Sequence, residues 1–417
     1  MTSASLVSTQ NRVEAPFIIV QVGDYTFGNC SKLVNKQAMS SSMKITYPNY
    51  LTSINITKIN GAINTYQIKF DYGITEFDDP NLLEKVFSSV SKSRKIVISY
   101  GDWNAPAYIY KEEEAIITKI QTQVDFSASK IIYTVSCTSN ALSMKAGTFS
   151  FNAKTAKPSD ELVNLLTNKA YGLSNIFAGM KGINKTNASK FIARDDKTVK
   201  LEAKSGVTIF EYISYLVACM VSNTDKGGAV KNARYFWAVY DDINNEYGGS
   251  YFKVSRVDVN AKYTLSYNTY EIDVGYPSGT LVTQFNINND ESWSLLYNYS
   301  KDIQLPEYSY SIDDSGSIVS TYSPSVTSSN VALKTREVDR NWWTQMTQFP
   351  IKATLTIKGL LRPALLMSYV KVNCFFYGHK HTSSGLYIIT KQQDTIDSSG
   401  YRTTLTLTRV SGDEYYV

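Results

Sequence analysis

The sequence predicts a mainly β protein of the α+β class, and three observations support this prediction. The 417 residues include 31 Tyr beside abundant Ser, Thr and Asn; aromatic and β-branched side chains suit strands, and Asn and Ser suit turns. Short blocks alternate polar and apolar residues, as half-buried strands do. Hydrophobic residues make up 43% and charged residues 19%, which is a globular composition, and the length suits about three domains.

The first predicted domain, residues 1–149, is a meander of strands with one helix. Its first strands are Phe17–Val22, Ile54–Ile59 and Thr65–Phe70, and Asn60-Gly61 is a strong turn signal between the last two. Asp79-Pro80 then opens a helix at about 82–92, because proline suits the first helical position. The remaining strands are expected at 95–100, 108–110, 115–124 and 131–137.

The second predicted domain, residues 150–232, is a small α+β module. Ser159 is the expected N-cap of a helix that begins SDELVNLL. A second helix begins at Thr208, where Thr208 and Glu211 fit a capping box in which each side chain satisfies a backbone amide of the other.

The third predicted domain, residues 233–417, returns to strands. They are expected at 235–240, 251–259, 281–287, 294–299, 353–358, 369–376, 385–391 and 403–409. A long loop is expected at about 303–345, because its first part is rich in Ser, Tyr, Asp and Pro without a clear period. Loops of that length in compact domains usually have a function or are disordered. The sequence therefore predicts two tube-like β-barrel domains flanking a small α+β insert.

Charge and cysteine content exclude several classes of protein. The net charge of +5 comes from scattered Lys and Arg, without the basic stripe typical of nucleic-acid binding. The cysteines Cys30, Cys137, Cys219 and Cys374 form no CxxC pair, so we expect buried thiols in a reducing compartment. No Sec-type signal peptide is recognisable, and the longest apolar stretch, 209–220, is too short to span a bilayer. We therefore expect a soluble intracellular product with no membrane partner.

One stretch near the C-terminus repeats an earlier one. Ile388–Thr408 aligns on Ile116–Ser136 without gaps at an offset of 388 − 116 = 272, and both copies contain IITK followed by a polar turn with Asp and Ser. Chance is one explanation, because β-hairpins draw on a small set of residues. Duplication of a β-domain is the explanation that we favour, and duplication would let a trimer present six similar modules to a sixfold ring.

The sequence offers little to an enzyme. Glu112, Glu113 and Glu114 alternate between the two faces of a strand, so we interpret them as a solvated strand entry and not as a paired acid and base. His379 and His381 could share a face and bind a metal, but without a nearby Cys or carboxylate a polar loop is the simpler interpretation. No phosphate-binding loop, dinucleotide motif or G-x-S-x-G turn occurs. We expect no catalytic residue, no metal and no cofactor.

The C-terminal residues resemble a known family. A strand ending at Gly359, a central strand, Gly385-x-Tyr387, a polar turn, and Gly400-Tyr401-x-Thr403 leading to a strand that ends at Arg409 resemble the closing barrel of phage baseplate hub proteins. This family is related to the hub of contractile tails and of type VI spikes. The resemblance is specific over roughly the last 70 residues, and Gln393-Asp394 stands where members often have His.

The resemblance implies a structural virion protein that is assembled in the host cytoplasm and placed in the tail baseplate. A homotrimeric ring would adapt the sixfold tail tube to a threefold tail tip or spike, and it would surround the exit channel for the genome. Its partners would be the tail tube protein, the spike or tip protein, other baseplate proteins and the tape measure protein, with DNA only in transit. Lytic or piercing activity would belong to another chain.

Five aromatic residues are candidates for the assembly interface: Trp342, Trp343, Tyr308, Tyr310 and Tyr322. Trp is enriched at interface hot spots, although core packing explains the tryptophans equally well, and the tyrosines of the expected loop could become ordered on assembly. The alternative function is a carbohydrate-binding or cell-wall-hydrolysing tail tip protein that uses Tyr and Trp as platforms for sugar. A third reading, a tail-tube-like subunit, predicts a single domain and conflicts with the repeat.

Overall fold

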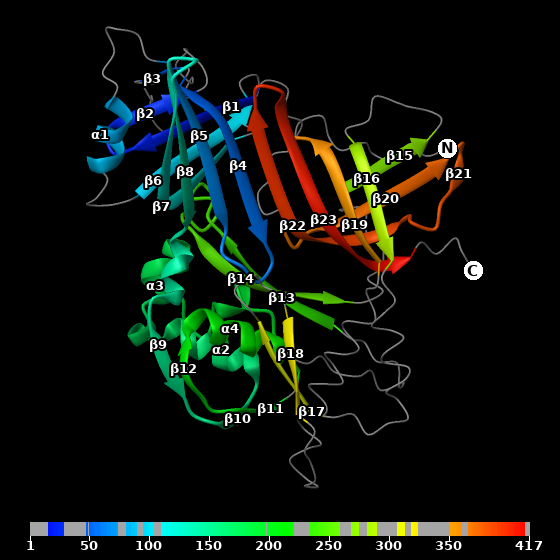
Figure 1. The fold of residues 1–417 in the computed structure, drawn as a ribbon. Helices are drawn as coiled ribbons and strands as arrows, with labels where there is room; N and C mark the ends of the chain where they lie inside the picture. Colours follow the sequence, from blue (N-terminus) through cyan, green and yellow to red (C-terminus); the bar gives the residue numbers. More distant parts are fainter. Residues whose placement is uncertain are drawn as a thin grey trace.

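A computed structural model gives the fold, and it describes residues 16–28, 47–48, 50–73, 81–89, 95–102, 110–196, 198–220, 233–258, 268–274, 282–289, 307–312, 318–323, 351–359 and 366–412. Strands dominate the chain (Figure 1). The expected mainly β class with a small α+β part is confirmed. The strands are β1 (Pro16–Val22), β2 (Tyr25–Gly28), β3 (Tyr47–Pro48), β4 (Leu51–Ile59), β5 (Thr65–Gly73), β6 (Lys95–Asp102), β7 (Tyr110–Asp125), β8 (Lys130–Ser139), β9 (Thr148–Phe151), β10 (Lys154–Ala156), β11 (Val199–Leu201), β12 (Lys204–Thr208), β13 (Ala233–Tyr240), β14 (Tyr251–Asp258), β15 (Asn268–Val274), β16 (Val282–Asn289), β17 (Glu307–Ile312), β18 (Ile318–Ser323), β19 (Ile351–Lys358), β20 (Tyr369–Phe376), β21 (His379–Lys380), β22 (Gly385–Asp397) and β23 (Gly400–Gly412).

Within the described residues the helices are fewer than the strands, and most of them lie in the middle of the chain. They are α1 (Leu82–Ser89), α2 (Pro158–Thr167), α3 (Leu173–Ile176) and α4 (Ile209–Ala218), with 3-10 segments at Asn140–Lys145, Lys169–Tyr171, Ala178–Met180 and Ala188–Lys190. Helix α4 begins with the predicted capping box, because Thr208 accepts from the amide of Glu211 and Glu211 accepts from that of Thr208. The predicted N-cap Ser159 is wrong. Lys157 stands at the N-cap position of α2 without a side-chain capping bond, and Pro158 is the first residue of the helix.

Among the described residues, one sheet of 15 strands runs through both strand-rich regions. Its strands follow the order β16-β19-β23-β22-β4-β5-β8-β7-β6-β1-β2-β3, and β20, with β15 and β21, pairs beside β22. Figure 1 shows β8, β5, β4, β22, β23, β19 and β16 side by side across the upper part of the molecule. The two expected β-domains are therefore halves of one continuous sheet, joined where β22 pairs with β4.

Each half of the sheet has its own core on one face. The first core contains Ile54, Ile68, Val135 and the ring of Phe87 from α1. The second contains Leu355, Tyr387, Leu405 and Leu407. Both follow from strict alternation: in β5 every second residue is buried, and in β19 the buried residues are Ala353, Leu355 and Ile357.

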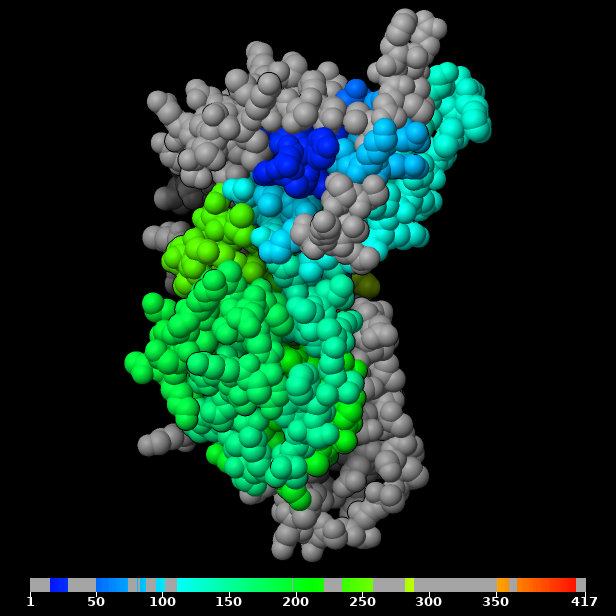
Figure 2. Space-filling model, turned by 90° about the vertical axis from the view of Figure 1, so that its left-hand side faces the viewer, coloured from blue at the N-terminus to red at the C-terminus, as the bar shows by residue number. Residues whose placement is uncertain are grey.

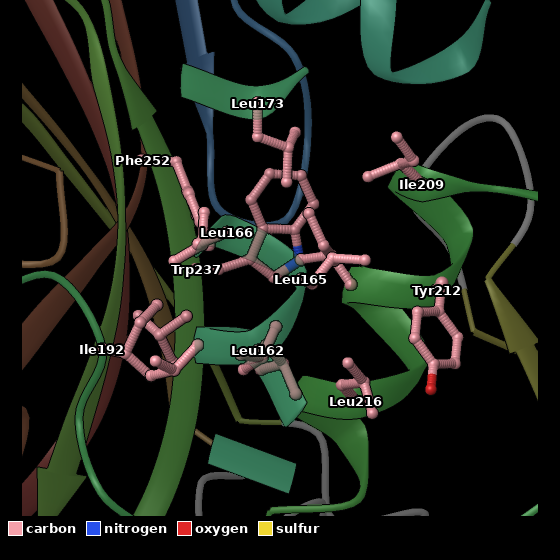
Figure 3. Packing of buried hydrophobic residues seen from close by; sticks show 14 of the residues in the cluster. Leu162, Leu165, Leu166, Leu173, Ile192, Ile209, Tyr212, Leu216, Trp237 and Phe252 are labelled. Carbon is pink, nitrogen blue, oxygen red and sulfur yellow. The ribbon is translucent and has the colours of Figure 1, made fainter. Parts of the chain in front are cut away.

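The small module packs below the sheet around α2 and α4. Leu162, Leu165 and Leu166 of α2 contact the apolar face of α4 and the ring of Trp237 (Figure 3). The hairpin β13–β14 is shared, because Trp237 and Val239 point into the module core whereas Phe236 and Ala238 point into the second core of the sheet. Figure 2 shows the module, in green, lying directly against the first half of the sheet, in blue and cyan. The boundaries 1–149, 150–232 and 233–417 remain a prediction.

The expected long loop at 303–345 is wrong in its first part. Strands β17 and β18 pair there in an antiparallel hairpin, from Glu307 opposite Ser323 to Ile312 opposite Ile318. Tyr and Ser alternate in EYSYSI, and IVSTYS is rich in β-branched residues; these are strand signals that the polar composition concealed. Residues 324–350 and the expected strand 294–299 lie outside the described residues.

Candidate functional site

The two IITK stretches occupy the same structural place. In β7 the register shifts between Ile117 and Lys119, and in β22 it shifts between Ile389 and Lys391, so a β-bulge lies at Thr118 and at Thr390. The hydroxyl of Thr118 donates to the carbonyl of Ser136 at 3.0 Å, and that of Thr390 donates to the carbonyl of Thr406 at 3.2 Å. The repeated IITK thus encodes a bulge, with a buried Ile before it and a Lys after it.

The turns of the two hairpins differ in length, which corrects the ungapped alignment. Asp125 pairs with Lys130 across four residues, whereas Asp397 pairs with Gly400 across two. The returning strands are therefore equivalent at an offset of 406 − 136 = 270, not 272. Because the change is two residues, every side chain keeps its face. Both turns retain an Asp that accepts from the amide and hydroxyl of a Ser two residues on, Ser127 and Ser399.

The equivalence extends to two more strands. The pairs β4–β5 and β16–β19 each have a bulge, at Thr52 and at Thr283. The hydroxyl of Thr52 donates to the carbonyl of Lys69 at 3.0 Å, and that of Thr283 donates to the carbonyl of Thr356 at 3.1 Å. Two four-stranded units, β4-β5-β8-β7 and β16-β19-β23-β22, therefore share strand order, register and bulges.

The internal joint is the place where the two units meet, through β22 and β4. Six residue pairs join them, from Lys391 opposite Ile59 to Ile396 opposite Ile54. Ile396 and Ile54 are both 0% exposed. On the other face of the sheet, the amide of Gln393 donates to the Asn55 oxygen at 3.2 Å. This joint is a complete, packed antiparallel pairing between two equivalent units.

The corresponding strands at the two open ends have no such partner in the described residues. The second half of β7, equivalent to the part of β22 in the joint, pairs only with β8. Strand β16, equivalent to β4, pairs only with β19. Val124 at 48% exposure stands where Ile396 stands, and Ile287 at 40% stands where the buried Ile56 stands. Ile120 on β7 is also exposed, so apolar side chains line both open edges.

A buried network of charges lies beneath the internal joint. Glu113 of β7 is paired with Lys58 of β4, and it accepts from the hydroxyls of Tyr66 and Tyr100 at 2.7 Å each. Asp241, just after β13, accepts from Asn64 at 2.7 Å, from Ser139 at 2.6 Å and from Tyr66 at 3.0 Å. The network ties the first half of the sheet to the hairpin that leads from the small module.

The pKa values in this network follow from burial and from its charges. Burial opposes ionisation of Glu113, but Lys58, Lys111 and the hydrogen bonds hold its pKa below the usual value. Burial raises the pKa of Asp241 to about 6, against the hydrogen bond from Ser139 and with the added repulsion of Glu113. Burial also raises the pKa of Asp394 on β22, whose oxygens accept from Thr403 and Gln392 at 2.6 Å each.

These charged groups correct one sequence interpretation and add residues that it missed. Glu113 is not part of a solvated strand entry, because it is fully buried among side chains from β4, β5 and β6. Lys58, Lys111, Asp241 and Asp394 carried no local signal, since their partners are distant in sequence. Each of them is buried, so the network can tie elements together but gives a dissolved substrate no access.

The residues singled out from the sequence lie elsewhere. In the register of β17–β18, Tyr308 is paired with Tyr322, and Tyr310 is paired with Ser320. Trp342 and Trp343 lie outside the described residues. His381 bonds Ser383 at 2.7 Å beside the ring of Phe376. In the part of the chain that the structure describes, no cluster of metal ligands occurs, and no helix is long and apolar enough to cross a membrane.

Cysteine burial follows the prediction for the described residues. Cys137, Cys219 and Cys374 are buried free thiols, and burial raises the pKa of the Cys137 thiol to about 12. Cys30 lies outside the described residues.

Comparison with known proteins gives structural similarity only. No family model matches the sequence, and no curated protein matches it. The fold resembles those of solved tail proteins. A tail protein from Neisseria meningitidis aligns with 95% of this chain and 97% of its own, at 9% identity and a TM-score of 0.47. A 43 kDa prophage tail protein from Shewanella oneidensis aligns with 96% and 100%, at 11% identity and a TM-score of 0.48.

A component of the Escherichia coli type VI secretion system, itself described as similar to bacteriophage T4 tail proteins, aligns with 87% of this chain and 74% of its own, at 8% identity and a TM-score of 0.44. Identities near 10% and TM-scores below 0.5 do not assign a function.

Proposed function

We propose that this protein is a structural component of a phage tail, a baseplate hub that forms a closed ring of three copies. The observation that supports this most strongly is the pair of open edges, which are equivalent to the two strands of the internal joint. In the ring, β7 of one copy pairs with β16 of the next in the way that β22 pairs with β4 inside the chain. The joint between copies then has the same strand pairing as the joint inside each chain. Such an interface is head-to-tail, which is the type that closes into rings.

The register of the internal joint predicts the register between copies. Each β22 residue corresponds to the β7 residue numbered 272 lower, and each β4 residue corresponds to the β16 residue numbered 231 higher, since 283 − 52 = 231. The internal pairs Thr395–Asn55 and Ile396–Ile54 therefore predict that Gln123 lies opposite Asn286, and Val124 opposite Phe285, of the next copy. Gln121 and Asn286 would then repeat the bond that Gln393 makes with Asn55, with identical residue types. Val124 and Ile287, exposed in the single chain, would become buried.

Three copies present six equivalent units around one axis, which suits a protein between a sixfold tail tube and a threefold tip or spike. The ring would surround the path of the genome, and the virion tail would be its location. The small module and the β17–β18 hairpin lie below the sheet (Figure 1), and in this proposal they would contact other baseplate proteins. A network of buried charges ties the first half of the sheet to the hairpin that leads from the small module, which suits a structural part.

Copy number and position test this proposal. Electron microscopy of tails, with the purified chain measured by sedimentation, is expected to give three copies in one ring at the end of the tube. A monomer that binds glycan or releases sugar would contradict the proposal and favour the carbohydrate-binding alternative.

A further inference from the structure

The two IITK lysines lie on the face of the sheet that is opposite the two cores. In β22 the side chains of Gln392, Asp394 and Ile396 are buried, whereas Lys391, Gln393 and Thr395 point to the other face. Lys119 stands on β7 at the position equivalent to Lys391, one residue after the same bulge. The shared bulge therefore sets both ammonium groups at the same height on this face.

This face is polar and carries more cations than carboxylates. Hydroxyl and amide side chains fill most of it, such as Gln67, Thr134, Thr354, Thr404 and Asn286. Its carboxylates lie near the turns of the two hairpins. Asp71 pairs with Lys130 at 3.3 Å, Asp397 pairs with Arg402 at 3.0 Å, and Asp125 accepts the hydrogen bonds of its own turn.

Lys119 and Lys391 are not neutralised by those groups. Neither forms an ion pair with a carboxylate among the residues that the structure describes. Lys119 is exposed, and Lys391 is half-buried because β4 covers its strand. Two positions that are structurally equivalent thus carry the same cation, among the hydroxyl and amide side chains of the described strands.

We propose that this face lines the channel of the ring and that Lys119 and Lys391 of three copies form a circle of six ammonium groups that contacts the phosphates of duplex DNA. This inference rests on the proposed ring, because only ring closure brings the six positions to one height. A lysine is a compact, hydrated charge on a flexible stem. Contacts of that kind are independent of base sequence and let the duplex slide.

The test measures DNA binding by the full chain. A short end-labelled linear duplex and a covalently closed circular duplex are titrated at several salt concentrations, because a closed ring admits the linear molecule only. K119Q/K391Q is compared with the parent, and K181Q/K200Q, which removes two exposed lysines of the small module, is the matched control. Sedimentation of all three proteins gives their oligomeric state.

We expect the parent and K181Q/K200Q to bind the linear duplex and not the circle. K119Q/K391Q is expected to bind the linear duplex at least about tenfold more weakly at low salt. The slope of log K against log salt concentration should also be shallower by up to about five, because each of the six neutralised phosphates contributes about 0.9. Three results would contradict the lysine circle while the ring stands, provided that trimers form. The double variant binds like the parent, the parent does not bind the linear duplex, or circular and linear duplexes bind alike. If the chain forms no trimer, both proposals fail.

Discussion

The internal joint and the two open edges are built from equivalent strands, yet the side chains on their core-side faces differ in charge. Lys58, Gln392 and Asp394 lie beneath the internal joint. The equivalent positions at the open edges are Asn289, Ile120 and Thr122, which carry no charge. The chain itself holds the internal joint closed, so its charges stay paired. A separate edge must stay in water before assembly, and neutral residues let it associate without the cost of burying an unpaired charge.

Open edges also carry a risk, because exposed strands pair with other chains. Natural proteins often block such edges with an inward-pointing charge, and the described part of β7 that would form the joint has none on its core-side face, where Ile120, Thr122 and Val124 stand. The absence of this protection at matched positions favours a specific partner, which we propose is a second copy.

The largest expected effect comes from placing a charge on the open edge. Val124→Lys would bury an ammonium group at each joint between copies, and we expect the ring to be lost while the chain stays folded, with its free energy of unfolding within about 0.5 kcal/mol of the parent. Sedimentation and thermal unfolding measure the two quantities. Leu142→Lys, a similar change at an exposed residue of the 3-10 segment Asn140–Lys145, should leave association unaltered. An equal loss of association in both variants would contradict the proposal that β7 forms the contact between copies.

The charge network beneath the internal joint should matter to stability and not to association as such. Glu113→Gln leaves Lys58 and Lys111 buried without their carboxylate, so we expect a loss of about 3–5 kcal/mol in the free energy of unfolding, measured with denaturant. The neighbour Glu114 forms a partly exposed pair with Lys95, and Glu114→Gln should cost less than about 1 kcal/mol. Similar losses for the two variants would contradict the claim that the network ties the first half of the sheet to the β13–β14 hairpin.

The pH dependence of stability sharpens the same comparison. The pKa of Asp241 is about 6 in the folded chain and 3.8 without burial, so the folded state binds the extra proton. Binding of this proton stabilises the folded state by an amount on the order of 3 kcal/mol. The stabilisation is fully present below about pH 4 and is lost as the pH rises through 6. The difference in unfolding free energy between the parent and Asp241→Asn should therefore fall from pH 4 to pH 6. A constant difference would contradict a raised pKa.

The smallest expected effects come from the bulge threonines. Thr118→Val and Thr390→Val each remove one hydroxyl donor to a strand carbonyl, and each should lower the unfolding free energy by about 1 kcal/mol. Equal effects are expected because the two bulges are structurally equivalent. A loss at only one site, measured by denaturant unfolding, would show that the two units have diverged at this position.

Sequence reasoning reached the parts of the fold that are encoded locally. The capping box at Thr208, the Asn60-Gly61 turn and the two IITK hairpins depend on neighbouring residues, and the structure has each of them. The burial of Glu113 could not be predicted, because it depends on Lys58, which lies 55 residues away in sequence.

The open edge on β16 did leave a signal. LTSINI at Leu51–Ile56 and VTQFNI at Val282–Ile287 share Thr, Asn and Ile at an offset of 231. A search at the single offset of 272 does not find this pair, because the segments between the strands differ in length in the two units. Likewise the shorter turn at Ser398-Ser399 shifts the last strand to an offset of 270. Insertions in loops move the offset while they leave the strand register intact.

The pairing of β7 with β16 of a second copy is tested most directly by a disulfide across the predicted register. Gln123→Cys combined with Asn286→Cys is expected to give a covalent ladder that ends at the trimer under oxidising conditions, because paired strands hold Cα atoms about 4.5–5.5 Å apart. Thr395→Cys with Asn55→Cys, which lie opposite each other in the internal joint, should close within one chain as a positive control. Gln123→Cys with Asn288→Cys is out of register and should cross-link poorly. Closure of the internal pair with no cross-linked species from Gln123→Cys/Asn286→Cys would contradict the ring.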